Sequence, residues 1–405
     1  MRLNSFLRRC AITAPAVVVG GDDVALGIVR DLGREGVPVL AMGPDRHGPA
    51  LRSRYSLPWP CADPHYDEER LIEDLEAVGS RLPQRGVVFP AHDDYVVALS
   101  RNKARLEKYF TVPVAPWERM KILADKELQM ELARQAGIDI PITAVIHGPE
   151  DLAAAAAGVP FPAVLKPAVP LAMVRRTGLK AVVVETRDRL DRAYGRLSFC
   201  GSLLLQEVVP GGDEEVYIAG TYHDAASRPL ALFTGRKLRQ HPRGFRVTRL
   251  GESRWSQELA DLTLKLLAQA CYQGVSDVEF KRDPRDGRFK LMEINARYGF
   301  WGPLATASGV NLPYIAYRDA IGRPCLGGRQ RDGVRWTDIL RDGPDSLREL
   351  RRRELSLHDW LTPLAAVRAD AYLSVRDPQP GLREIGRLGV RLVRRGLGSG
   401  DGGPG

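Results

Sequence analysis

The segment GVSDVEFKRDPRDGRFKLMEINAR, from Gly274 to Arg297, carries more structural information than any other part of this 405-residue chain. It contains two runs in which apolar and polar residues alternate, Val275–Lys281 and Phe289–Asn295, with RDPRDGR between them. Alternation with a period of two is typical of half-buried strands, and short polar segments rich in Asp, Gly and Pro are typical of the turns that join them. The segment therefore predicts a β-hairpin.

The pairing expected in this hairpin gathers oxygen atoms on one face. Glu279 is expected opposite Glu293. Asp277 then lies opposite Asn295, and side chains two apart on a strand point the same way. The other face receives the apolar side chains of Val278, Phe280, Met292 and Ile294. Opposed carboxylates repel unless a cation lies between them, and Mg²⁺ prefers oxygen ligands completed by substrate phosphates. The hairpin is therefore a candidate metal site; the alternative is a solvated strand face whose acids have no such role.

Composition excludes several classes of protein. A hydrophobic content of 44% with 27% charged residues fits a globular chain, and 405 residues are enough for two or three domains. No apolar run approaches the roughly 20 residues that a membrane-spanning helix needs, and we expect no secretory signal. The net charge of +9 favours anionic substrates or an anionic surface. Nucleic acid is not expected as a partner, because basic and aromatic residues are not interleaved.

The cysteine pattern favours a reducing compartment. The five cysteines form neither a CxxC motif nor a disulfide or zinc pattern; they are Cys10, Cys61, Cys200, Cys271 and Cys325. We therefore expect a cytoplasmic protein.

The N-terminal region predicts a parallel sheet. AVVVG at 16–20 has the pattern of a buried strand, 24–35 that of a helix and 37–42 that of a second strand, and GVVFP at 86–90 predicts a third. This order is that of a βαβ unit. The glycine pair after the first strand could belong to a dinucleotide site, but the GxGxxG spacing is absent, so a tight turn at the sheet edge is favoured.

Two local predictions concern the middle of the chain. KILADKELQMELARQA, at 121–136, has the apolar spacing of one helix that stops at Gly137. AVPLAMVRRTGL, at 168–179, predicts a loop between strands over 161–167 and 180–184.

Cationic residues precede the acidic hairpin. Lys126 lies in the predicted helix, Lys166 ends a buried strand and Lys180 begins the next one. Arg236 and Lys237 follow in FTGRKLRQHP. A charged group at the end of a buried strand is costly without a partner, and phosphate oxygens are natural partners of Lys. Any one of these lysines is more often a surface residue, but together with a metal site they supply what a nucleoside triphosphate needs.

The C-terminal region is basic. EIGRLGVRLVRRG, at 384–396, has the pattern of an amphipathic helix. Two interpretations stay open: weak contact with an anionic membrane surface or a partner, or a solvated helix that packs by its Leu and Val face, which is favoured. The final GSGDGGPG is expected to be disordered.

The order of these motifs resembles that of the ATP-grasp superfamily over residues 16–325. The matching pieces are VLKP at 164–167, LLQEVVPGGDEE at 204–215, and VEF with LMEINAR at 278–297, followed by a glycine-rich loop. The last piece is the most specific. Within the superfamily the chain looks like the carboxylate–amine ligase group, which ALFTGRKLRQHP at 231–242 also resembles.

The resemblance implies a mixed α/β and α+β architecture. A Rossmann-like pre-ATP-grasp domain would span residues 1–115, and an ATP-grasp domain would span residues 116–325. The ATP-grasp domain would divide into a small lid subdomain at about 140–210 and a metal-binding subdomain at about 211–325. A basic extension would follow at 326–405.

The resemblance also implies a reaction. ATP phosphorylates a carboxylate, an amine attacks the acylphosphate, and an amide forms with release of ADP and phosphate. Phosphorylation helps because a carboxylate repels nucleophiles and oxide is a poor leaving group. The protein must neutralise charge and exclude water from the intermediate. One small-molecule substrate is expected to be an amino acid, and a homodimer is expected.

The implied ligands are ATP and Mg²⁺ or Mn²⁺. The resemblance assigns to ATP the residues Lys126 and Lys166 at the phosphates, Gln206, Glu207, Val208 and Val209 at adenine, and Glu214 or Glu215 at the ribose. The register of PGGDEE leaves the choice between the last two open.

The remaining implied residues act on metal and substrate. Glu279, Glu293 and Asn295 would hold two metal ions. Arg297 would stabilise the transferring phosphoryl group or the tetrahedral intermediate. Arg236 and Lys237 are candidates for the γ-phosphate or the substrate carboxylate.

One segment departs from the family pattern. The phosphate-covering loop is usually rich in glycine, whereas 168–179 holds a single glycine and bulky side chains. Arg175, Arg176 or Lys180 would then substitute for backbone amides; alternatively, the loop reaches the acceptor, or ATP binding is weaker.

Two other functions stay open. One is an ATP-grasp enzyme with a different acceptor, and the other is a nucleotide-binding protein without ligase activity, against which the complete hairpin set argues. In the N-terminal region, HDD at 92–94 could bind an amine and Arg46, Arg52 or Arg54 a carboxylate, although each is more often a plain loop residue.

Overall fold

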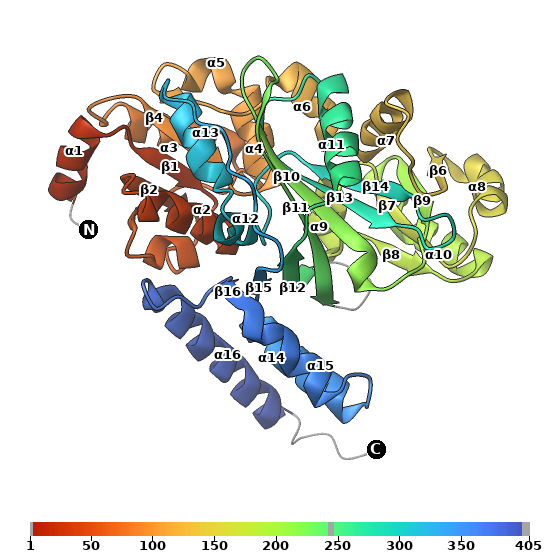
Figure 1. Cartoon of the computed structure of the whole chain (residues 1–405). Coiled ribbons are helices and arrows are strands. Elements are labelled where there is room, and N and C mark those ends of the chain that lie inside the picture. Colours follow the sequence, from red (N-terminus) through yellow and green to blue (C-terminus); the bar gives the residue numbers. More distant parts are fainter. Residues whose placement is uncertain (1–2, 242–246, 399–405) are drawn as a thin grey trace.

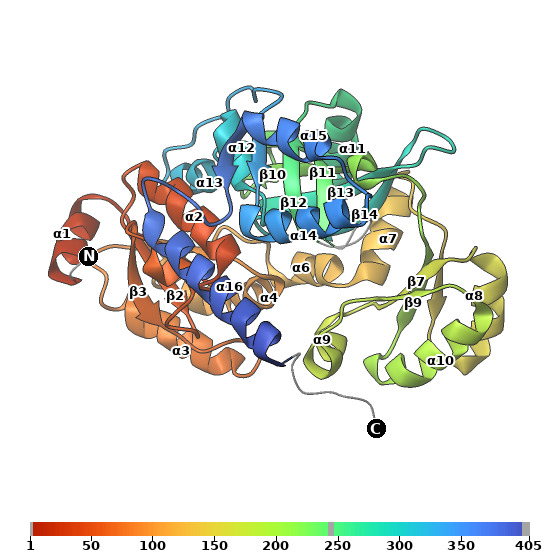
Figure 2. The same ribbon diagram turned by 90° about the horizontal axis from the view of Figure 1, so that it is seen from below.

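The computed structural model describes residues 3–241 and 247–398, whose strands form three sheets (Figure 1). A five-stranded sheet lies on the N-terminal side, a seven-stranded sheet lies centrally, and a four-stranded sheet lies beyond it. Figure 2 shows the four-stranded sheet, with helices α8 (Leu152–Gly158) and α10 (Arg187–Leu197), set apart from the rest. No helix in the two described stretches is long and apolar enough to cross a membrane. The predicted mixed α/β class is confirmed.

The N-terminal sheet is parallel throughout, with strand order β3-β2-β1-β4-β5. Its strands are β1 (Ala16–Val19), β2 (Val39–Gly43), β3 (Ser56–Pro60), β4 (Gly86–Pro90) and β5 (Phe110–Thr111). The helices of this region are α1 (Leu3–Ile12), α2 (Asp23–Arg34), α3 (Glu68–Gly79), α4 (Asp93–Arg101) and α5 (Lys103–Leu106). Val19 of β1 pairs with Pro90 of β4, so the turns after these two strands lie together at one edge, where parallel sheets bind ligands. The predicted βαβ unit is confirmed.

The glycine pair after β1 makes a sharp turn into α2. Gly20 has φ +135° and Gly21 has φ +76°, a backbone region that favours glycine. A Cβ at Gly20 would also lie 2.8 Å from the Cβ of Ala91. The next residue, Asp22, accepts a hydrogen bond from the Ala25 N–H at 3.0 Å and caps the helix. The tight turn favoured from the sequence is therefore present.

The four-stranded sheet is antiparallel, with order β6-β9-β7-β8. Its strands are β6 (Thr143–Ile146), β7 (Ala163–Pro167), β8 (Val182–Val184) and β9 (Leu203–Glu207). Ile146, Leu165 and Leu205 form a core with the helices α8 and α10. The predicted loop at 168–179 is wrong in part, because α9 (Leu171–Thr177) forms there and ends at Gly178. Leu, Ala and Met in this segment have high helix propensity. The helix also allows Met173 to be fully buried in the same core.

The central sheet has the order β14-β13-β10-β11-β12-β15-β16. Its strands are β10 (Val216–His223), β11 (Pro229–His241), β12 (Val247–Ser253), β13 (Gly274–Arg282), β14 (Phe289–Asn295), β15 (Arg335–Thr337) and β16 (Val367–Asp370). Helices α11 (Gln257–Gln269), α12 (Pro303–Ser308) and α13 (Leu312–Ala320) pack on it. The last two strands come from the C-terminal extension, so this extension completes the sheet.

The predicted single helix over 121–136 is wrong. The structure has two helices, α6 (Trp117–Ala124) and α7 (Lys126–Gln135), with Asp125 between them. The Asp125 carboxylate accepts a hydrogen bond from the Glu127 N–H at 2.8 Å and caps α7. A capping Asp competes with helix continuation, and apolar spacing alone does not register this break. The break makes Lys126 the first residue of α7.

The C-terminal extension connects the central sheet to the N-terminal region, because it contacts both. Helices α14 (Ile339–Arg351), α15 (Leu357–Leu361) and α16 (Pro378–Gly398) follow β15, and Figure 2 shows α16 running across the N-terminal region. Arg30 of α2 donates to Asp377 at 2.9 Å, and both side chains are almost wholly buried. The Ser53 hydroxyl and the Arg54 N–H also donate to Asp377. The predicted basic helix at 384–396 lies within α16, whereas Ser399–Gly405 of the predicted disordered tail lie outside the described residues.

Arg30→Met should destabilise the folded protein by about 3–5 kcal/mol, because it leaves the Asp377 carboxylate buried without its cation. Urea unfolding followed by circular dichroism measures this loss. The matched control is Arg70→Met, which breaks the exposed Arg70–Glu73 pair and should cost at most about 1 kcal/mol. Equal losses for the two variants would contradict the role of the buried pair.

Candidate active site

The hairpin pairs as the sequence predicts. Glu279 of β13 lies opposite Glu293 of β14, and Asp277 lies opposite Asn295. A β-bulge follows Glu279, so that Phe280 pairs with Leu291. The prediction that Met292 joins the apolar face is therefore wrong: Leu291 packs there instead. Strict alternation would place Leu291 and Glu293 on one face, and the bulge separates the core residue from the acid.

Two lysines from other elements neutralise the paired carboxylates. Lys237 of β11, which is almost wholly buried, donates to Glu279 Oε2 at 2.5 Å. Lys126 of α7 forms an ion pair with Glu293 Oε1. Burial raises the pKa of Glu293, but the charge and hydrogen bond of Lys126 outweigh it, and the pKa falls to about 2. Glu293 therefore stays ionised at neutral pH, and each of the two acids lies beside a cation.

Lys166 of β7 approaches this acid pair from the four-stranded sheet. Its Nζ donates to Gln206 Oε1 at 2.9 Å, and Gln206 Nε2 donates to the Thr143 hydroxyl at 3.0 Å. Burial, with the nearby charge of Lys126, lowers the pKa of Lys166 to about 8. The structure thus brings together Lys126, Lys166 and Gln206, the residues that the resemblance assigns to ATP.

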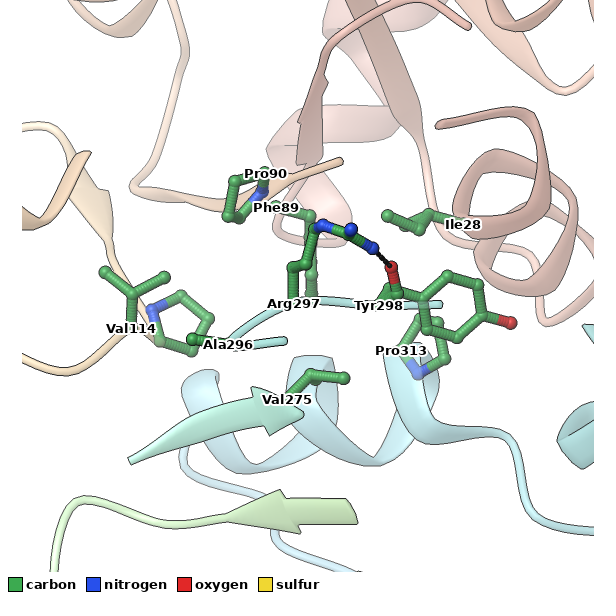
Figure 3. Close-up of a pocket in the computed structure, with 10 residues that line it drawn as sticks. Ile28, Phe89, Pro90, Val114, Val275, Ala296, Arg297, Tyr298 and Pro313 are labelled. Carbon is green, nitrogen blue, oxygen red and sulfur yellow. Dashed lines mark hydrogen bonds between the residues drawn. The ribbon is translucent and has the colours of Figure 1, made fainter. Parts of the chain in front are cut away.

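Arg297 connects the hairpin to the edge of the parallel sheet. Its Nε donates to Asp93 Oδ1 at 2.8 Å, and its Nη2 donates to Asn295 Oδ1 at 3.2 Å. Figure 3 shows its guanidinium reaching toward the Tyr298 carbonyl, beside a cavity lined by Phe89, Pro90 and Val275. Burial opposes the charge of Arg297, but Asp93 outweighs it and raises the pKa of the guanidinium. A fixed cation therefore lies between the candidate metal site and the edge of the parallel sheet where the turns after β1 and β4 meet. This edge is called the substrate edge below.

Arg236 is not brought to the paired acids. It precedes Lys237 on β11, so the two side chains point to opposite faces. The Arg236 guanidinium donates instead to Glu252 at 3.1 Å, and Glu252 also accepts from Arg335 at 2.9 Å. Arg236 therefore has a partner in the sheet that accounts for its charge.

The residues assigned to adenine and ribose lie at the end of β9 and in the segment that follows it. Val209 is buried, and the Val208 N–H donates to the Pro162 carbonyl at 3.3 Å. The Glu207 carboxylate is buried and accepts from Arg285 in the hairpin turn at 2.8 Å, so its side chain faces that turn.

The two candidate ribose acids follow on a 3-10 turn, Asp213–Glu215, where Glu214 is exposed and Glu215 half-buried. Burial lowers the pKa of Lys281, and the negative charges of both acids act in the opposite direction.

The segment that departs from the family pattern contributes one cation to the site. Lys180 lies close enough to Glu293 and Asp93 to lower the pKa of both, although burial acts against this at each carboxylate. The Arg176 guanidinium instead stacks 4.4 Å from the centre of the Phe199 ring. The side chain of Arg175 lies outside what the structure describes.

The hairpin offers oxygen donors suited to a hard cation. Within residues 3–241 and 247–398, no group of three or more His, Cys, Asp or Glu side chains is placed to hold a metal ion. The donor set is two carboxylates with the amide of Asn295, whose Nδ2 donates to the Asp277 carbonyl at 3.2 Å. Mg²⁺ commonly takes one or two carboxylates and completes its shell with phosphate oxygens and water. The residues therefore fit a metal that arrives with a nucleotide.

Sequence reasoning missed two features of this site. Asp277 Oδ1 is buried without a hydrogen-bond partner, and burial raises the pKa of this carboxyl to about 7. A Cβ at Gly299 would lie 1.9 Å from Asp277 Oδ2, so the glycine allows the following loop to cover the carboxyl. The pairing of Asp93 with Arg297 was also missed, because these residues lie 204 positions apart. The acidic turn after β4 was the available signal.

No family model matches the chain, but its sequence is similar to those of known proteins. A D-aspartate ligase of Enterococcus faecium is 25% identical over 328 residues, which cover 75% of this chain and 76% of that ligase. The carbamoyl phosphate synthase large chain of Archaeoglobus fulgidus is 26% identical over 231 residues, which cover 54% of this chain. The matched part is 21% of that large chain.

Solved structures share the fold. N5-carboxyaminoimidazole ribonucleotide synthetase, in its ADP complex, has a TM-score of 0.64 at 16% identity, over 84% of this chain and 86% of its own. An L-amino acid ligase from Bacillus licheniformis has a TM-score of 0.61 at 16% identity, over 80% of this chain and 78% of its own. The chain therefore shares the fold of these solved structures and is similar in sequence to the D-aspartate ligase, in agreement with its resemblance to the ATP-grasp superfamily.

Proposed function

We propose that the protein is an ADP-forming ligase that uses ATP to join a carboxylate to an amine. The observation that carries this proposal is the pair Glu279 and Glu293, each beside a lysine, with Arg297 next to them at the substrate edge. Opposed acids with exchangeable cations suit a site that must accept a metal and a triphosphate together. A protein that held nucleotide without turnover would have no need of this arrangement.

The cationic side chains would hold and orient the phosphates. Lys126 and Lys237 pair with the acids, and metal binding at those acids would release both ammonium groups toward phosphate oxygens. Lys166 would bind on the lid side. Mg²⁺, when bound, would neutralise the phosphates and lower the barrier to phosphoryl transfer. Adenine would lie along Gln206–Val209, with Glu214 or Glu215 at the ribose.

Arg297 would act at the reacting carbon. Attack of an amine on an acylphosphate places negative charge on the former carbonyl oxygen, and a preorganised cation stabilises that charge. Asp93 and Asn295 fix the orientation of the guanidinium, so little reorganisation is needed when the charge develops. Removal of such a group typically slows the reaction about 10²–10³-fold.

An amino acid is the substrate class that similarity favours. The matched relative is a D-aspartate ligase, and a matched structure is an L-amino acid ligase. We infer that this chain activates the carboxylate of an amino acid such as aspartate. We also infer a reducing, cytoplasmic setting, because the five cysteines, all within the described residues, are free. A homodimer and membrane contact through α16 stay predictions.

The test is ADP and phosphate release from Mg-ATP with D- and L-amino acids and small amines, offered singly and in pairs. Release that requires an acid and an amine together, with ADP rather than AMP, supports the ligase. If ATP binds but no acid, alone or with an amine, stimulates phosphate release, the proposed function is wrong for small-molecule substrates.

Glu293→Gln should reduce ligase turnover at least about 100-fold while the fold is retained, because it removes one carboxylate from the metal site. Steady-state ADP release and circular dichroism measure the two effects. Glu258→Gln, at an exposed position of α11, is the control and should behave as wild type. Wild-type turnover in Glu293→Gln would show that Glu293 is not a ligand of a catalytic metal.

ATP affinity should fall as pH rises above about 8 and should change little between pH 6.5 and 7.5. Lys166 has a lowered pKa of about 8 and is therefore charged below that pH, and phosphate binding requires the charged form. Calorimetric titration at several pH values between 6.5 and 9 measures this profile. Lys166→Gln should bind more weakly, with a flat profile over this range; the same decline in that variant would rule out Lys166 as the titrating group. Lys265→Gln, on the exposed side of α11, is the control.

A further inference from the structure

A second pair of polar side chains, Asp22 and His92, lies beside the Asp93–Arg297 pair. Asp22 directly follows the turn after β1, and His92 follows β4. Because β1 and β4 are neighbouring parallel strands, both residues lie at the same edge of the sheet. His92 Nε2 contacts Asp22 Oδ2. The result is an Asp–His pair at the substrate edge, one residue away from the partner of Arg297.

The pair lies close enough to Arg297 for their charges to interact. Burial raises the pKa of Asp22, whereas the charges of His92 and Arg297 act to lower it, so all three groups share one electrostatic environment. The side chains of His92 and Asp22 are 40% and 32% exposed, so a substrate can reach them. In the described part of the chain the other ring nitrogen, Nδ1, has no protein hydrogen-bond partner. That nitrogen is available to a ligand.

Folding does not account for the imidazole. His92 stands at the N-cap position of α4, but its side chain makes no capping hydrogen bond. Asp22 caps α2 with Oδ1, which accepts from the Ala25 N–H at 3.0 Å, and uses Oδ2 for His92. Oδ1 of Asp22 therefore stabilises the helix, whereas Oδ2 lies against the His92 ring and orients it.

Amide formation needs a group that takes a proton. The acceptor amine is an ammonium ion at neutral pH and cannot attack until one proton leaves. Histidine is the most common general base, because its imidazole changes charge near neutral pH. Arg297 and the lysines at the phosphates are cations and cannot serve. Glu279 and Glu293 are occupied by lysines or metal.

We propose that His92 is the general base of the ligation and that Asp22 is its positioning residue. This inference rests on the proposed ligase function. His92 Nδ1 accepts one proton from the acceptor ammonium, while the Asp22 carboxylate beside Nε2 stabilises the imidazolium. The freed nitrogen lone pair forms the C–N bond, and the C–O bond to phosphate breaks with its electron pair on phosphate. The second proton on nitrogen leaves with the phosphate, so the products are an amide, hydrogen phosphate and protonated His92.

The charges around His92 suit a cationic acceptor. On α2 they are Asp22 and Asp23, and on α4 they are Asp93 and Asp94.

Other elements supply partners for these acids: Arg297 after β14 pairs with Asp93, His65 after β3 with Asp94 at 3.3 Å, and the Tyr372 hydroxyl donates to Asp23 at 2.9 Å. Arg297 and Lys180 are the nearby cations, so the four carboxylates leave this edge with a net negative charge, which attracts an ammonium ion and favours proton transfer to the ring.

The test compares two nucleophiles on the same enzyme. Hydroxylamine is a weak base that is unprotonated at neutral pH, so its attack on an acylphosphate needs no general base. His92→Gln should lose amide formation with alkylamines by about 10²-fold or more in kcat. Hydroxamate formation from the same acid, Mg-ATP and hydroxylamine should stay within about threefold of wild type. His358→Gln, on the exposed helix α15, is the control and should match wild type in both assays.

The partner residue gives an independent measurement. Asp22→Asn keeps the helix cap, because Asn caps as well as Asp, but removes the charge beside His92. The acidic limb of the kcat profile should move to lower pH, since the imidazolium loses its stabilising neighbour, and kcat should fall. Asp22→Glu should restore part of the wild-type profile.

Either of two results overturns the proposal. One is wild-type amide formation in His92→Gln at all pH values; the other is an equal loss of amide and hydroxamate, which would place His92 before the amine step. If the wild-type enzyme forms no hydroxamate from any acid, the ligase function itself fails and the inference fails with it. An unchanged pH profile in Asp22→Asn would remove Asp22 from the pair.

Discussion

The active site depends on the repulsion between two carboxylates held opposite each other on one hairpin. Like charges in this position destabilise a strand pair unless cations lie beside them. Glu279 meets Lys237, and Glu293 meets Lys126. These lysines come from β11 and from the start of α7, so the charge of the hairpin also determines where those two elements can approach. The same requirement explains why a metal and a triphosphate would be accepted together.

The substrate edge is assembled by contacts that reach from the hairpin into the N-terminal sheet. Arg297 follows β14 and pairs with Asp93. The next residue, Tyr298, donates its hydroxyl to the fully buried Asp31 of α2 at 2.5 Å, and Thr306 donates to the same oxygen at 2.8 Å. The glycine-rich loop is thus anchored at both ends to α2. The buried Arg30–Asp377 pair ties the C-terminal extension to the same helix.

The hairpin register and the βαβ unit could be predicted because both depend on local alternation and turn residues. The bulge at Met292 could not, since alternation carries no sign of an extra residue. The break at Asp125 was missed because the residue caps one helix while it interrupts the apolar spacing very little. Strands β15 and β16 are short; β15 finds its place in the sheet by pairing with distant β12, and β16 by pairing with β15.

The candidate site was predicted in its residues but not in its pairing. Lys126, Lys237, Glu279 and Glu293 were all singled out, yet no local pattern says which lysine meets which acid. Lys126 and Glu293 lie 167 positions apart, and tertiary structure alone brings them together. Arg236 is the opposite case. Its position next to Lys237 suggested a shared role, but consecutive residues of a strand point to opposite faces of the sheet, so Arg236 points away from the paired acids.

The central claim is that the paired carboxylates form the metal site of a nucleotide-binding enzyme. Calorimetric titration of ADP with and without Mg²⁺, in wild type and in the Glu279→Gln/Glu293→Gln double variant, tests it most directly. Wild type should bind ADP at least about tenfold more tightly with Mg²⁺, whereas the double variant should bind ADP with no gain from the metal. A full Mg²⁺ effect in the double variant would contradict the account.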